Sequence, residues 1–132
     1  MNARTLPVKL DHSAFISQPG KLEILVKFFT EILGWAVVKK TPVYDWGYSY
    51  FVCNGEDTLQ LSDYTSFKGG QLPVHIGLDL TDPADMLQVI RDFAQGEGLR
   101  IEDIKAESLP GGKFMVVWPE IVPFSFEACP IN

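Results

Sequence analysis

The pattern of apolar and polar residues along this chain predicts the same order of strands and helices twice. In the first half, an alternating stretch at 8–17 predicts a strand. A helical stripe follows it and stops before Gly34, where a helix C-terminal cap is expected; its members are Leu22, Leu25, Val26, Phe29, Ile32 and Leu33. Three short strands complete this half, with predicted ranges 35–39, 46–53 and 58–62.

The second half restarts the same order after a glycine-containing stretch at 65–72, which we interpret as a linker. A strand is expected at 73–80, and a second helical stripe that ends at Gly96 consists of Met86, Val89, Ile90 and Phe93. The last three strands are predicted at 99–104, 113–118 and 123–129. The layout predicts an α+β fold in which two tandem βαβββ modules, 8–64 and 73–129, form a single domain over 1–132.

Composition narrows the class of protein. The 132 residues are 46% hydrophobic and 21% charged, which is typical of one globular domain. The net charge of -6 argues against nucleic acid and against an anionic membrane surface as partners. The chain has no apolar run long enough to span a membrane and no hydrophobic N-terminal signal, so we expect a cytoplasmic protein. Its two cysteines, Cys53 and Cys129, are expected to be reduced.

Four polar residues stand at matching places in the two halves. The only histidines, His12 and His75, sit early in the first strand of each half, and Gln60 and Glu127 sit in the last strand of each half. Alternation puts His75, Gln60 and Glu127 on the polar side of otherwise apolar strands, whereas the direction of His12 is less clear. If the halves pack with pseudo-two-fold symmetry, the four side chains converge in one cup.

The quartet is a nitrogen and oxygen donor set, which suits zinc, nickel, iron, cobalt or manganese better than calcium. Since Glu127 is its only charged member, a divalent ion would leave about +1 at the centre and would stabilise an oxyanion or enediolate. Taken singly, each of the four residues could instead be an ordinary packing or surface residue and not a metal ligand. Gln60 also has the option of lining the cup without ligation, which would leave a His12, His75, Glu127 triad typical of non-haem iron.

Five short motifs carry a resemblance to a known family: "LDH", "KFFTEILGW", "LQL", "HIGLDL" and "FSFEA". Together with the repeat, they resemble the vicinal-oxygen-chelate superfamily of glyoxalase I, fosfomycin- and bleomycin-resistance proteins and extradiol dioxygenases. The resemblance implies a cupped, partly open β-barrel and a homodimer. It assigns the metal positions to His12, Gln60, His75 and Glu127, with Glu127 also as the general base.

The resemblance favours a divalent-metal-dependent lyase or isomerase of glyoxalase type, acting on a small oxygen-chelating substrate through an enolate-like intermediate. The third strand, "WGYSYFVC", lacks the second catalytic glutamate of the related epimerases. Two alternatives stay open: a metal-free binding or resistance protein that sequesters a small molecule, and a non-haem iron dioxygenase. An aromatic cluster would serve the first, and its members are Tyr44, Trp46, Tyr48 and Tyr50. For a substrate pocket the candidates are Tyr48, Tyr50 and Trp118.

Overall fold

The computed structural model describes residues 6–7, 9–42, 48–64 and 66–131. The strands of the first module form a four-stranded sheet, here sheet A, in the order β1-β4-β3-β2. Their bounds are β1 (Ser13–Ile16), β2 (Ala36–Pro42), β3 (Tyr48–Cys53) and β4 (Thr58–Ser62). β1 runs parallel to β4, and the other neighbours are antiparallel.

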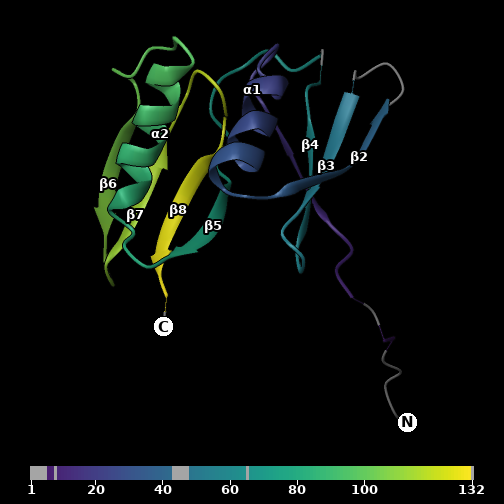
Figure 1. The fold of residues 1–132 in the computed structure, drawn as a ribbon, viewed down its shortest axis with the longest axis horizontal. Helices are drawn as coiled ribbons and strands as arrows, with labels where there is room; N and C mark the ends of the chain where they lie inside the picture. The colour runs from purple at the N-terminus through teal and green to yellow at the C-terminus, as the bar shows by residue number, and fades with distance from the viewer. Residues whose placement is uncertain (1–5, 8, 43–47, 65, 132) are drawn as a thin grey trace.

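The second module builds sheet B with the same order, β5-β8-β7-β6, and again only its first and last strands in sequence pair in parallel. The bounds are β5 (His75–Leu80), β6 (Lys105–Leu109), β7 (Lys113–Val117) and β8 (Ser125–Pro130). The predicted pair of βαβββ units is therefore confirmed. The two sheets stand next to each other and do not close into one barrel (Figure 1).

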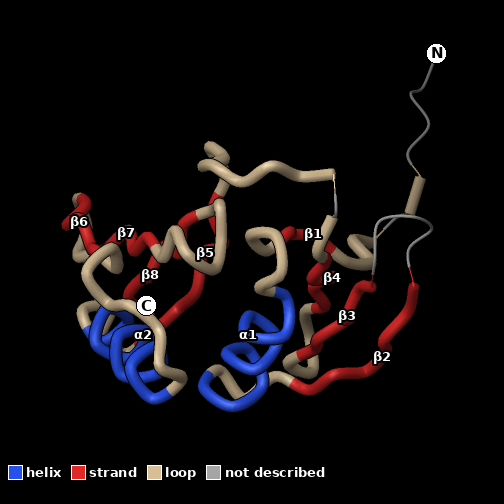
Figure 2. Tube along the Cα trace, turned by 90° about the horizontal axis from the view of Figure 1, so that it is seen from above, coloured by secondary structure: helices blue, strands red, loops and turns tan. Residues whose placement is uncertain are grey.

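The predicted helices are present, and both lie on the same side of the sheets (Figure 2). α1 (Leu22–Lys27) continues into a π-helical turn, η1 (Phe28–Ile32), and α2 covers Asp85–Gly96. Gly34 has a positive φ of 75°, as expected for a helix cap. Within the described residues, no helix is both long and apolar enough to cross a membrane.

Burial in the π-helical turn differs from the predicted stripe. Phe28, the first residue of the turn, is outside that stripe but has no exposed surface. Ile32, inside the predicted stripe, is 41% exposed. Phe28 reaches from the first module into the second, because its ring centroid lies 5.5 Å from those of Phe93 and Trp118 and 5.8 Å from that of Phe126. The two modules thus share one hydrophobic core on the helix side.

The predicted strand at 99–104 is wrong. That segment is a loop in which the backbone N–H of Ile104 donates to the carbonyl of Ile101 at 3.1 Å, and Ile104 is buried. The strand lies after it, in β6, whose residues are mostly exposed. β6 is an edge strand with little apolar alternation, so its sequence carries a weaker strand signal than the isoleucine pair before it.

Candidate functional site

Each sheet has one face packed on the helices and one face turned away from them, which we call its open face. On sheet B, the buried Ile76, Val116 and Phe126 mark the helix side. Because strand side chains alternate, His75 and Glu127 point to the open face, as the sequence predicted. Glu127 pairs in register with Gly77 on β5, where an added Cβ would meet open space. The β5 position paired with Glu127 therefore carries no side chain.

The Glu127 carboxylate is the centre of a small polar cluster on sheet B. Its Oε2 lies 3.5 Å from His75 Nε2, and its Oε1 lies 3.6 Å from Lys113 Nζ. The same Oε1 accepts a hydrogen bond from Cys129 Sγ at 3.3 Å. The Glu127 side chain is 17% exposed and that of His75 is 51% exposed. The carboxylate is thus well shielded, but each of its oxygens has a polar neighbour.

Partial burial and the neighbouring Glu127 raise the pKa of the Cys129 thiol. Burial disfavours the thiolate, and the carboxylate adds to this effect by accepting the S–H hydrogen bond and by repelling a second negative charge. Cys129 therefore acts as a protonated donor to Glu127. Both Cys129 and Cys53 are free cysteines, in agreement with the sequence expectation.

Sheet A holds the other two predicted ligands. Gln60 is on the open face of β4, where its Nε2 donates to Ser49 Oγ at 2.9 Å and its carbonyl oxygen takes no part in that bond. His12 immediately precedes β1, with Nδ1 at 2.7 Å from Asp11 Oδ2 and its ring edge-on to Phe51 at 5.2 Å. A carboxylate on one histidine nitrogen fixes the ring orientation and leaves the other nitrogen for a ligand.

The structure therefore brings only His75 and Glu127 of the quartet into direct contact, on sheet B, whereas His12 and Gln60 belong to sheet A and each contacts other residues. Within the described residues, no three side chains of His, Cys, Asp or Glu cluster closely enough to hold a metal ion. The 3.5 Å between His75 Nε2 and Glu127 Oε2 nevertheless fits metal chemistry, because two ligands on neighbouring vertices of a zinc-like ion lie about 3.0–3.4 Å apart.

Two of the residues suggested for a substrate pocket lie in the core instead. Trp118 has no exposed surface and packs edge-on against Phe28. Tyr50 is 9% exposed, and its hydroxyl donates to Glu23 Oε1 of α1 at 2.7 Å, so it points to the helix side of sheet A. Alternation puts Tyr48, 54% exposed, on that same side. Tyr44 and Trp46 lie outside the described residues.

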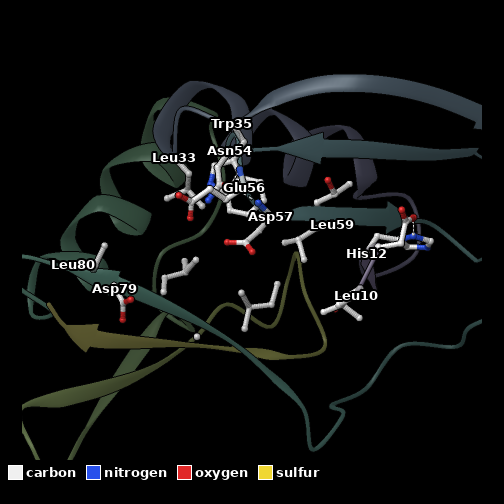
Figure 3. Close-up of a pocket in the computed structure, with 16 residues that line it drawn as sticks. Leu10, His12, Leu33, Trp35, Asn54, Glu56, Asp57, Leu59, Asp79 and Leu80 are labelled. Atoms are coloured by element: carbon white, nitrogen blue, oxygen red, sulfur yellow. Dashed lines mark hydrogen bonds and ion pairs between the residues drawn. The ribbon is translucent and has the colours of Figure 1, made fainter. Parts of the chain in front are cut away.

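A cavity of about 600 Å³ opens between β5 and the end of sheet A (Figure 3). His12 is the only quartet member in its wall, whose carboxylates come from Asp11, Glu56, Asp57 and Asp79. A second cavity, of about 520 Å³, is mostly apolar and adjoins His75. Its other walls come from β1, from Tyr64 and the segment that precedes β5, and from Phe124. Room for a small ligand therefore exists beside both histidines.

Two neighbours of the quartet were missed from the sequence, although the sequence carries a signal for each. Asp11 is adjacent to His12 in the chain. Lys113 is found only when β7 is paired with β8: Met115 opposes Glu127, so alternation brings Lys113, two residues away, to the same open face.

Comparison with known proteins gives the fold. No family model and no curated protein sequence matches the chain. Among solved structures, the fosfomycin resistance protein FosX of Mesorhizobium loti is similar with a TM-score of 0.60 and 15% identity, over 94% of this chain and 92% of that one. FosX of Listeria monocytogenes, solved with Mn(II) and sulfate, has a TM-score of 0.63 and 11% identity, over 96% and 93% of the two chains.

Glyoxalase I of Leishmania major is similar with a TM-score of 0.58 and 24% identity, over 89% of this chain and 84% of that one. These neighbours are members of the vicinal-oxygen-chelate superfamily. The chain has the glyoxalase-like fold of that superfamily, with two sheets that do not close into a barrel, as the sequence predicted. At these sequence identities, the similarity to the solved structures establishes the fold and not the function.

Proposed function

We propose that two copies of this chain associate so that the open face of sheet A in one copy meets the open face of sheet B in the other. The site between them binds one divalent metal ion through His12 and Gln60 of one chain and His75 and Glu127 of the other. The observation that carries this proposal is the His75–Glu127 pair, whose Nε2 and Oε2 lie 3.5 Å apart, while among the described residues no third His, Cys, Asp or Glu side chain lies close enough to complete a metal site.

Sheet edges and exposed apolar residues support the association. β1 and β5 are edge strands of their sheets, so their outer hydrogen-bonding groups have no strand beside them within their own sheets. Leu10, before β1, is 84% exposed, and Val74, before β5, is 46% exposed. A second copy is the simplest partner that would cover both edges by one symmetric contact.

We propose that the protein is a metal-dependent lyase or isomerase of glyoxalase type that acts on a small oxygen-chelating substrate. A bound divalent ion would polarise a substrate carbonyl and stabilise negative charge on its oxygen. Glu127 accepts and returns a proton. Its two oxygens have different neighbours, because His75 lies beside Oε2 and Cys129 donates a hydrogen bond to Oε1. The apolar cavity beside His75 gives room for the non-chelating part of the substrate.

The test is metal analysis of protein purified without chelator, with His75→Ala, Glu127→Ala and the control Glu107→Ala. Glu107 is exposed on β6 and pairs with Met115, so it shares the sheet but not the candidate site. Near-stoichiometric zinc, nickel, cobalt, manganese or iron that is lost only in the first two variants is expected. A wild type that takes up no metal even on reconstitution contradicts the proposal. With metal found, hemithioacetals of 2-oxoaldehydes and acyl-CoA thioesters are the first substrates to screen.

A further inference from the structure

We propose that Lys113 is a specificity-determining residue that binds an anionic group of the substrate. Its ammonium group stands on the open face of sheet B, 3.6 Å from Glu127 Oε1, and its side chain is 44% exposed. The inference rests on the proposed function, because it concerns what Lys113 does when Glu127 serves as a metal ligand.

The ion pair of Lys113 with Glu127 is loose. At 3.6 Å the nitrogen and oxygen are beyond ordinary hydrogen-bond distance, and the same Oε1 already accepts from Cys129 at 3.3 Å. The exposed ammonium hydrogens are therefore available to another acceptor on the open face. A half-exposed pair of this kind adds little stability, which makes a structural role a weak explanation for Lys113.

Metal binding would weaken that pair further. A divalent ion that shares the charge of Glu127 reduces the attraction of the carboxylate for Lys113, and its own charge repels the ammonium group. The quartet leaves about +1 at the metal, and Lys113 adds a second positive charge beside it. The uncompensated charge next to the metal is matched by a substrate that carries an anionic group in addition to the oxygens it chelates.

Carboxylate, phosphate and phosphonate groups share the chemistry that an ammonium group recognises, namely oxygen acceptors with negative charge. The inference is thus a preference for anionic chelators over less charged chelators of the same denticity. It assigns no role to Lys113 in proton transfer.

The experiment measures binding of two bidentate oxygen chelators, oxalate and acetohydroxamate, to the Mn(II)-loaded wild type, Lys113→Met and Lys113→Arg. The control Lys105→Met removes a lysine of the same sheet from the edge strand β6, where it pairs with Val117 and not with β8. Loss of a charge-assisted hydrogen bond should weaken oxalate binding by about tenfold in Lys113→Met. Acetohydroxamate binding should change less than about twofold, Lys113→Arg should retain the preference, and Lys105→Met should match wild type.

Mn(II) affinity and thermal melting, measured on every variant, separate binding from folding. Equal loss of both chelators in Lys113→Met, or no loss of either, overturns the Lys113 assignment while the metal site stands. A wild type that binds no Mn(II) or other divalent ion overturns the proposed function and this inference with it.

Discussion

Sheets A and B have the same strand order but differ on their open faces. On sheet B, a carboxylate, an imidazole, an ammonium group and a thiol meet around Glu127. On sheet A, His12 and Gln60 are each held by a separate partner, Asp11 and Ser49, and Gln60 is neutral. The duplicated fold thus has unequal halves: sheet B presents a polar cluster around one carboxylate, and sheet A presents two side chains that are each oriented by a different partner. Among the residues that the structure describes, neither half gathers three His, Cys, Asp or Glu side chains closely enough to hold a metal ion.

The helix side shows the opposite behaviour, because there the two modules are not separable. Phe28 of the first module is buried against Phe93, Trp118 and Phe126 of the second. Phe28→Ala should lower the free energy of unfolding by about 3–5 kcal/mol, since it removes a large ring from a closed core. Ile32→Ala, 41% exposed on the same turn, should cost far less. Denaturant unfolding checks both, and equal losses would contradict a core shared through Phe28.

Glu127→Gln sharpens the contrast between the faces because it keeps the size of the side chain and removes the charge of sheet B. Divalent metal affinity should fall more than about 100-fold, since even loss of an outer partner of a ligand costs 10–100-fold. Titration calorimetry with Mn(II) or Zn(II) measures it, and Glu107→Gln on β6 is the matched control. Unchanged affinity in Glu127→Gln would remove Glu127 from the site.

Gln60→Ala asks whether sheet A contributes a ligand or only a wall. If the carbonyl oxygen of Gln60 ligates, metal affinity should fall about tenfold, and Gln60→Glu should restore or exceed the wild-type value because it adds charge. If Gln60 only lines the cup, both variants should bind as wild type does, and the triad of His12, His75 and Glu127 becomes the better description. Ser49→Ala, which removes the partner of Gln60 Nε2, serves as the control for orientation.

The smallest effect concerns Cys129. Its raised pKa means that less thiolate is present at any pH below that pKa than in an ordinary cysteine, so alkylation should be slow near pH 8 and should speed up as pH rises. Glu127→Gln removes one cause of the shift and leaves burial in place, so the rate should rise only a few-fold. Peptide mapping after iodoacetamide treatment measures it, with Cys53 as internal reference. If the alkylation rate of Cys129 is the same in Glu127→Gln as in wild type, the contact between Sγ and the carboxylate is contradicted.

The sequence carried the architecture and the directions of most ligands, because both follow from periodicity. Alternation in β4 and β8 put Gln60 and Glu127 on the polar faces, and most strands are those the pattern predicted to within a few residues. β6 and the π-helical turn were missed for opposite reasons. The edge strand β6 carries little apolar signal. The sequence of η1 does carry apolar residues, but the prediction assumed α-helical spacing, and the turn is π-helical.

The division of the quartet could not be predicted in the same way. Alternation tells which face of its own sheet a side chain occupies, but not which other sheet that face meets. That depends on how the modules pack, and the core around Phe28 joins them by their helix sides. Trp118 illustrates the same limit: the sequence makes it a pocket candidate, but its packing against Phe28 of η1 and Phe93 of α2 buries it.

The most direct test of a site shared between two chains is complementation. His12→Ala and Glu127→Gln proteins, each defective in metal binding, are mixed at equal amounts, dissociated and reassociated. If each site takes His12 from one chain and Glu127 from the other, half of the dimers are hybrids with one intact site, so about a quarter of all sites should bind metal. If every site draws its ligands from a single chain, no mixture regains metal binding, and the proposed site between two copies is contradicted.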